Sequence, residues 1–299
     1  MPPGTVVKIA AQHGVLITEE EVRRRYAYRD FLEFIETFKW VTSFLRKPAD
    51  YAIVVRDFAE ALLGQHVVYA EVTLSIGVMQ LRGQDPQANF DAILEVAEEF
   101  ESRGLRLRWV WDAIRQFGVE AAMAVVEAAG RCRSDKIVAF GIGGDERSLP
   151  ARDFRGVYGR ASDLGMHRLI HAGEVGGPEN IRQAIEFLSV ERIGHGIAAI
   201  GDPALLDLLA EKQIPLEICP ASNICTGALS ALLNTESATI TEHPLPKLFR
   251  HGIPIVLSTD DPAMFHTTLA GEYENAWKMG LDKTELERLV EMSFTHAFR

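Results

Sequence analysis

The sequence predicts an α/β protein built on a parallel sheet, and two features lead to this prediction. From residue 67 onward, short runs rich in β-branched residues alternate with amphipathic stretches of helical period, which is the pattern of repeated β-α units. The chain of 299 residues is also 47% hydrophobic and 24% charged, as expected for a globular protein with a large core. A closed (β/α)-barrel and a doubly wound sheet both fit this alternation.

Seven strands are expected, each bounded by glycine, proline or polar turn residues. Their ranges are 67–74, 105–112, 137–141, 167–171, 192–195, 215–219 and 254–258. Helices are expected between them, over residues 90–102, 119–129, 179–188, 203–212 and 244–251. The spacing leaves room for little beyond one helix in each connection, and no linker or repeat divides the chain. Residues 1–299 are therefore predicted to form a single domain.

The first 65 residues are predicted to be helical throughout, and residues 28–40 carry aromatic side chains at roughly helical intervals. Such a stripe most often packs into a core. A second interpretation places these helices beside the mouth of a barrel, where they would supply an apolar wall to a pocket.

Charge and cysteine content exclude several classes of partner. The net charge is −11 and no basic run exceeds the three arginines at 23–25, so a nucleic-acid surface is not expected. Three cysteines without a C-x-x-C pair indicate a reducing cytoplasm and no disulfide framework. No segment approaches the roughly 20 apolar residues that a bilayer requires, so no membrane partner is expected. No pattern in the sequence predicts an oligomeric state.

Ionisable side chains follow four of the predicted strands at the points where these strands end. Residues 171–174 read His-Ala-Gly-Glu, 192–196 read Arg-Ile-Gly-His-Gly, 219–223 read Cys-Pro-Ala-Ser-Asn, and 258–262 read Ser-Thr-Asp-Asp-Pro. Taken singly, a strand-end histidine or an Asp-Asp-Pro turn is an ordinary structural feature. Their joint occurrence at successive strand ends favours a catalytic site that binds a metal and transfers protons.

Strand geometry sorts these residues further. His167 and His171 share a face but lie about 13 Å apart, which makes His171 the candidate ligand. Asp260 and Asp261 can serve different tasks only if the last strand ends there, with one as ligand and the other handling protons. The histidines without such partners are predicted to be surface or capping residues: His13, His66, His243, His251 and His266.

These four motifs, in this order, resemble the adenosine deaminase family. The 24 residues that separate His171 from His195 fit one barrel crossover, and residues 143–146, Gly-Gly-Asp-Glu, are similar to the family's Gly-Asp-Glu segment. The resemblance extends from residue 67 to the C-terminus. It implies a TIM-type (β/α)8 barrel with residues 1–65 as a helical lid region, and hydrolytic deamination of a 6-aminopurine nucleoside to the 6-oxopurine and ammonia.

The resemblance also implies residue roles. A Zn²⁺ ion, one per chain, is expected on His171 and Asp260, where it would activate a water molecule near neutral pH. His195 is expected to orient that water and to help remove its proton, and Glu174 to protonate the purine ring.

Two further contacts complete the implied site. Asp261 is expected to hold the attacking hydroxide or the imidazole side of the purine. The amide of Gly144 is expected to contact the opposite edge of the ring.

The sequence departs from the family pattern at its first strand. The family opens with a His-x-His strand that supplies two more metal ligands, and no His-x-His occurs in this sequence. The barrel is therefore predicted without its first strand, and two ligands are expected to hold zinc weakly. Elemental analysis that finds close to one tightly bound zinc per chain would refute this expectation. The alternative is a catalytically impaired barrel that acts as a binding or scaffold protein.

A second departure concerns the substrate. Adenosine-specific members commonly read Glu-Val-Arg at the first predicted strand, and this chain has Glu-Val-Thr at 71–73. Together with residues 38–40 and 142–144, this is similar to the branch that deaminates 6-aminodeoxyfutalosine in menaquinone synthesis. Adenosine and 6-aminodeoxyfutalosine both remain candidate substrates, ahead of adenine, and an amidohydrolase-type hydrolysis of another amide or ester is a third possibility.

Overall fold

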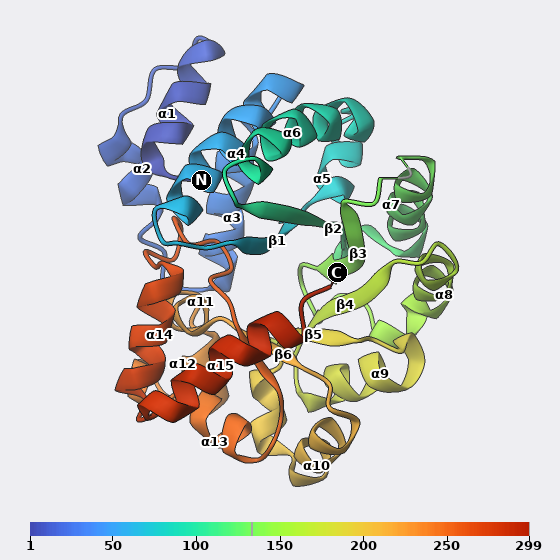
Figure 1. The fold of residues 1–299 in the computed structure, drawn as a ribbon, viewed down its shortest axis with the longest axis vertical. Coiled ribbons are helices and arrows are strands. Elements are labelled where there is room, and N and C mark those ends of the chain that lie inside the picture. The colour runs from blue at the N-terminus through green and yellow to red at the C-terminus, as the bar shows by residue number, and fades with distance from the viewer. Residues whose placement is uncertain (133, 299) are drawn as a thin grey trace.

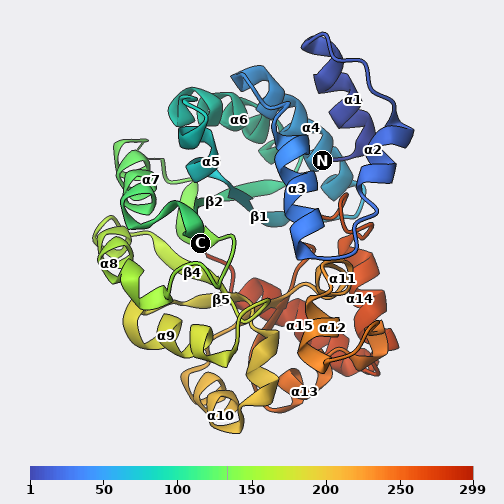
Figure 2. The same ribbon diagram turned by 180° about the vertical axis from the view of Figure 1, so that it is seen from behind.

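The computed structural model describes residues 1–132 and 134–298, and its centre is a sheet of seven parallel strands. The strands are β1 (Tyr69–Leu74), β2 (Arg106–Ile114), β3 (Ile137–Gly143), β4 (His167–Ala172), β5 (Arg192–His195), β6 (Leu216–Ile218) and β7 (Ile255–Leu257). They pair in chain order, and in Figures 1 and 2 they curl around a common centre with the helices outside. Sequential order around a curled sheet confirms the TIM-type arrangement and excludes the doubly wound alternative.

The sheet is curled but open. Within the described residues, no ladder joins β7 to β1, so these two strands form its ends. β1 is half-buried to exposed along its length, whereas every residue of β3 is buried. The sheet thus corresponds to seven strands of a barrel, with both terminal strands unpaired on one side.

Helices follow the strands on the outer side of the sheet. The main connecting helices are α6 (Pro86–Glu101), α7 (Val119–Cys132), α8 (Arg155–Asp163), α9 (Pro178–Leu188), α10 (Pro203–Lys212) and α13 (Leu245–Arg250). Their starts are encoded locally: in α10, Asp202 accepts a hydrogen bond from the Leu205 amide and Pro203 occupies the first turn. None of the described helices has the length and apolar character that a membrane crossing requires.

Shorter elements occupy the loops, and two further helices end the chain. The short elements are α5 (Ile76–Leu81), α11 (Pro220–Cys225), α12 (Ala228–Leu233), η1 (Arg115–Phe117), η2 (Ala151–Phe154), η3 (Ile197–Gly201) and η4 (Ile240–Glu242). The last helices are α14 (Leu269–Lys278) and α15 (Lys283–Thr295), and α15 packs on β7.

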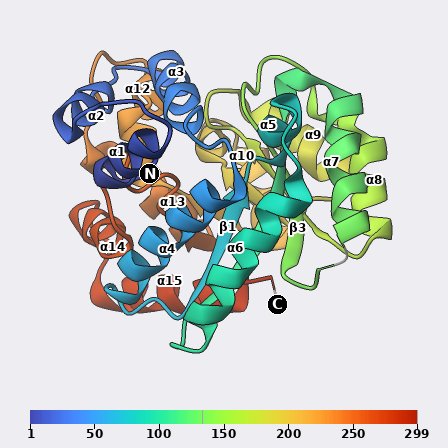
Figure 3. The same ribbon diagram turned by 90° about the horizontal axis from the view of Figure 1, so that it is seen from above.

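The N-terminal region is helical as predicted, with α1 (Pro3–Gln12), α2 (Glu19–Arg25), α3 (Phe31–Thr42) and α4 (Pro48–Leu63). Figure 3 shows α4 beside α6, and the two helices are in contact. Phe34 of α3 is buried, and its ring centroid lies 4.9 Å from that of Phe265 in the loop after β7. At this position the aromatic stripe packs into the core and fixes α3 next to that loop.

The amino-terminal ends of the strands enclose a buried ion cluster, here called the floor cluster: Glu71, Arg192, Glu217 and Phe298. Arg192 is 3% exposed and pairs with Glu71 of β1 and with Glu217 of β6, the latter at 2.6 Å. The ring of Phe298 lies 3.8 Å from the guanidinium carbon, and its amide donates to Glu71 Oε1 at 2.6 Å. Phe298 therefore lies between β1 and β5, in contact with both members of the Glu71–Arg192 pair. Glu71, the first residue of the Glu-Val-Thr segment, therefore serves the packing of the barrel in this structure.

Candidate active site

Four of the predicted site residues converge at the carboxyl ends of the strands. His195 Nε2 lies 3.6 Å from Glu174 Oε2 and 4.0 Å from Asp260 Oδ2. The imidazole rings of His171 and His195 have centroids 5.3 Å apart. Residues from three separate strand ends thus surround one small volume, as the barrel arrangement requires.

The backbone at two of these residues is in an uncommon conformation. His195 has a φ of 61° and Asp260 a φ of 53°, both in the left-handed region that L residues with a side chain rarely adopt. β7 ends at Leu257, so the turn at Asp260 leaves the alternation of the strand. The two neighbouring aspartates are therefore free to serve different tasks, which is the condition that the sequence prediction set. Strained residues of this kind cluster at functional sites.

The electrostatics favour protonated carboxyl groups. Burial, together with the nearby Asp260 carboxylate, raises the pKa of Glu174 to about 8. Burial and Asp260 also raise the pKa of Asp261 to about 7, against the opposing effect of the Met1 amine. A carboxyl group that keeps its proton near neutral pH is suited to act as an acid.

The side chains present fit an ion of the zinc type. Imidazole nitrogens and carboxylate oxygens are its usual donors, and within the described residues His195, Cys219 and Asp260 bring donor atoms within 4.8 Å of one another. Burial raises the pKa of the Cys219 thiol well above its usual value, so this sulfur is a poor ligand. His171 adds an imidazole whose Nδ1 is buried without a hydrogen-bond partner.

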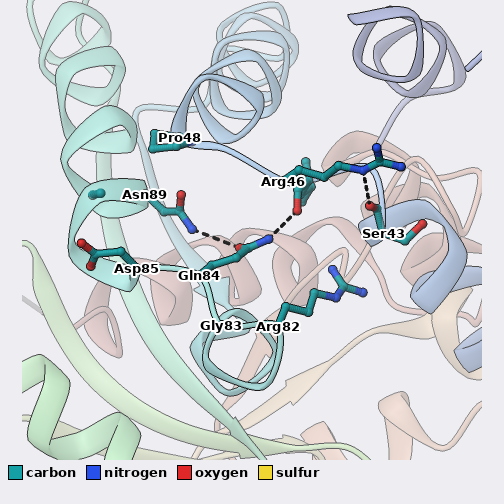
Figure 4. A pocket seen from close by; sticks show the side chains of 10 residues that line it. Ser43, Arg46, Pro48, Arg82, Gly83, Gln84, Asp85 and Asn89 are labelled. Carbon is teal, nitrogen blue, oxygen red and sulfur yellow. Dashed lines mark hydrogen bonds between the residues drawn. The ribbon is translucent and has the colours of Figure 1, made fainter. Parts of the chain in front are cut away.

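A cavity of about 380 Å³ lies elsewhere, where the loop between α3 and α4 meets the loop between α5 and α6 (Figure 4). Gln84 spans it, donating to the Leu45 carbonyl at 2.6 Å and accepting from Asn89 at 3.1 Å. Arg82 donates to the Thr42 carbonyl at the end of α3. These bonds attach the N-terminal helices to the barrel, and none of the strand-end residues lines the cavity.

Comparison with known proteins identifies the family. The adenosine deaminase family description matches residues 1–299. This chain belongs to the adenosine deaminase family. It is 36% identical to an aminodeoxyfutalosine deaminase of Streptomyces coelicolor over 306 residues, covering 99% of this chain and 77% of the relative. It is 33% identical to an adenine deaminase of Agrobacterium fabrum over 299 residues, covering 99% of this chain and 90% of the relative.

The solved structure of a deaminase has a similar fold. The adenine deaminase from Arthrobacter aurescens superposes with a TM-score of 0.92 at 25% identity, covering 100% of this chain and 90% of that one. The prediction of an adenosine deaminase-like aminohydrolase is thereby confirmed. The role of each residue within this deaminase fold stays a prediction.

Gly144 is held in a conformation that suits glycine alone. It follows β3 with a φ of +94°, and a Cβ atom there would lie 2.4 Å from Gln116 Oε1. That oxygen accepts a hydrogen bond from the next amide, Asp145 N–H, at 3.0 Å. The backbone at Gly144 is therefore fixed, which is what the predicted contact to a purine edge would need.

We expect Gly144→Ala to lower the free energy of unfolding by about 1–3 kcal/mol, because the new Cβ adds strain at a positive φ. Urea denaturation measures this change. The matched control is Gly159→Ala in α8, where a Cβ meets no atom within 4 Å and the exposed helix should gain about 0.5–1 kcal/mol. Equal effects of the two substitutions would contradict the role given to the backbone at Gly144.

The residues that hold the backbone of the site in place were not predicted from the sequence. Glu146 is 2% exposed, and its carboxylate accepts hydrogen bonds from the amides of Gly173, Glu174 and Val175 at 2.6, 2.8 and 3.1 Å. Arg115 is buried and donates to the carbonyl of His171 at 2.8 Å. A carboxylate that is buried with three amide donors fixes the loop that carries Glu174. Its sequence signal is the Gly-Gly-Asp-Glu segment at 143–146, in which the resemblance assigns a role to Gly144 alone.

The motif at 219–223 also supports the site. Ser222 donates to Asp260 Oδ2 at 2.8 Å, and Asn223 lies 3.2 Å from His195 Nδ1. His243, predicted to be a surface or capping residue, is in fact buried and lies 3.2 Å from Asn223. Its Nδ1 accepts a hydrogen bond at 3.1 Å from the Leu245 amide at the start of α13, so only the surface alternative of that prediction is wrong. A histidine outside the strand ends gives no sign in the sequence that the loops fold it beneath the site.

Proposed function

We propose that this chain catalyses the zinc-dependent hydrolytic deamination of a 6-aminopurine, with aminodeoxyfutalosine as its substrate. The observation that carries the proposal is the convergence of His171, Glu174, His195 and Asp260 at one rim of the sheet. The similarity to aminodeoxyfutalosine deaminases at 36% identity supports this substrate. Adenine is the second candidate, because adenine deaminases reach 33% identity, and adenosine is to be tested beside them.

The proposed roles follow from the chemistry of each group. His171 and Asp260 would hold the zinc ion, which when bound lowers the pKa of water to near 7. Glu174, which is buried and favours its protonated form, would protonate a ring nitrogen of the purine and so ease attack at C6.

Three groups would position the reactants. His195 would orient the attacking water, because its Nε2 faces both Glu174 and Asp260. Asp261 would hold the hydroxide or the imidazole side of the purine, and the Gly144 amide would contact the opposite ring edge. The product would be a 6-oxopurine with release of ammonia. We place this reaction in the cytoplasm, in line with three unpaired cysteines in the described chain.

The direct test follows the ultraviolet absorbance of zinc-supplemented protein with aminodeoxyfutalosine, adenine and adenosine in parallel. We expect kcat/KM for aminodeoxyfutalosine to exceed kcat/KM for adenine and for adenosine by at least about tenfold, because one well-placed contact changes kcat/KM by about that factor. Faster turnover of adenine would favour the second candidate. Purine binding without turnover would favour the binding-protein alternative, and cleavage of esters or amides alone would end the deaminase proposal.

Asp260→Asn is expected to weaken zinc binding at least tenfold, because a neutral amide oxygen is a poorer donor than a carboxylate. Competition with a zinc-binding dye measures the affinity of wild type and variant. Asp261→Asn is the matched control: the neighbouring residue is expected to keep the zinc affinity and to lose turnover. If the two variants bound zinc equally well, Asp260 would not be a ligand.

A further inference from the structure

A row of three buried side chains leads away from the strand-end site. His195 Nδ1 lies 3.2 Å from Asn223 Nδ2, and Asn223 Oδ1 lies 3.2 Å from His243 Nε2. His195, Asn223 and His243 are 2%, 0% and 3% exposed, so water has little access to any of them. We call His195, Asn223 and His243 the imidazole relay.

A backbone amide fixes the direction of every hydrogen bond in the relay. The N–H of Leu245 donates to His243 Nδ1 at 3.1 Å, and a peptide N–H can only donate. Nδ1 of His243 is therefore unprotonated. Burial lowers the pKa of His243 to about 3, so the ring is neutral and its one proton sits on Nε2.

This proton sets the orientation of Asn223. His243 Nε2–H donates to the oxygen of the Asn223 amide, which leaves the amide nitrogen facing His195. The flipped amide would donate to His243, whose two nitrogens would then both accept, and a neutral imidazole has only one accepting nitrogen. The flipped arrangement is thereby excluded.

We propose that Asn223 and His243 are positioning residues that keep Nδ1 of His195 as a hydrogen-bond acceptor and its ring proton on Nε2, pointing into the active site. Nδ1 of His195 accepts from Asn223, so the ring proton must lie on the other nitrogen. Nε2–H then faces Glu174 Oε2 at 3.6 Å and Asp260 Oδ2 at 4.0 Å.

This tautomer restricts what His195 can do. A protonated Nε2 has no lone pair, so it can neither bind a metal ion nor accept the proton of the attacking water. His195 is thereby excluded as a ligand although it lies in the His195–Cys219–Asp260 group. The next step rests on the proposed function: His195 donates a hydrogen bond to the attacking oxygen. This role replaces the expectation that His195 helps to remove the proton of the attacking water.

Nitrogen NMR of the full chain labelled with ¹⁵N-histidine tests the tautomer directly. The chain has nine histidines, and the His195 signals are assigned by their loss in His195→Gln. We expect Nδ1 of His195 to show the shift of an unprotonated nitrogen and Nε2 that of a protonated one. The reverse assignment, or an equal mixture of both tautomers, overturns the proposal.

Asn223→Asp tests the cause. A carboxylate can only accept, so it should move the proton of His195 to Nδ1 while keeping the shape of the side chain. Supporting partners of this kind typically contribute about 10–100-fold to activity, so kcat should fall by that factor while KM stays within about threefold. The neighbouring Ser222→Ala, which removes a bond to Asp260 and none to His195, should leave the tautomer unchanged.

The variant His243→Phe is an independent test, because it removes the hydrogen-bond donor that orients the Asn223 amide. A mixture of His195 tautomers is expected, and an unchanged Nε2–H signal would show that Asn223 needs no help from His243. If either variant fails to fold, the wild-type spectrum alone shows which nitrogen of His195 carries the proton, and this decides the proposal. The Nε2–H tautomer without turnover of any purine would count against the proposed function only, and turnover with the opposite tautomer would count against the relay only.

Discussion

Glu174→Gln is expected to lower kcat by about 100- to 10,000-fold, the usual contribution of a positioned acid, while zinc affinity stays unchanged. The amide has nearly the shape of the carboxyl group but carries no acidic proton that it could give to the purine ring. The loop that carries it is fixed by Glu146 through the Gly173, Glu174 and Val175 amides, so the substitution leaves the geometry in place. Steady-state kinetics on zinc-supplemented protein measure the effect.

The matched control is Glu186→Gln, the same change on the exposed side of the following helix α9. This control should keep full activity. A Glu174→Gln protein that retained the wild-type rate would remove the assigned acid from the mechanism, and one that lost zinc as well would show that Glu174 is itself a ligand.

Arg192→Leu is expected to destabilise the fold by about 3–5 kcal/mol, the usual effect of removing one partner from a buried ion pair. The substitution leaves Glu71 and Glu217 facing each other without a counter-charge, and it removes the donor to the His296 carbonyl at 2.7 Å. Chemical denaturation or the melting temperature measures this change.

A surface pair gives the comparison for this prediction. Arg182 pairs with Asp202 at 2.6 Å, but these side chains are 34% and 24% exposed. Arg182→Leu should therefore cost at most about 1 kcal/mol. Similar losses for both arginines would mean that the floor cluster is no more than a set of ordinary surface charges.

The strands could be predicted from the sequence nearly to the residue, because each is a short apolar run between turn residues. The expected strand at 192–195 is the observed β5, and that at 137–141 extends two residues further as β3 (Ile137–Gly143). The strand-end residues His171, Glu174 and Asp260 could likewise be predicted, since a parallel sheet brings its carboxyl ends to one edge. Local pattern and sheet geometry suffice for this level of detail.

The supporting contacts could not be predicted, because they join segments whose distance depends on tertiary packing. Asp260 bonds to Ser222, 38 residues earlier, and His243 bonds to Asn223, 20 residues earlier. The choice between a barrel and a doubly wound sheet was open for the same reason. Periodicity shows which face of a strand is buried, but not which loop covers it.

The floor cluster has a consequence for the order in which the chain matures. The amide of Phe298 bonds to the Glu71 carboxylate across 227 positions of sequence. On the ribosome, β1 is synthesised long before Phe298, so this contact cannot form until residue 298 has left the exit tunnel. During that interval the carboxylate of Glu71 and the guanidinium of Arg192 lack their contacts with Phe298, so β1 is exposed to wrong pairing while the intervening strands are being made.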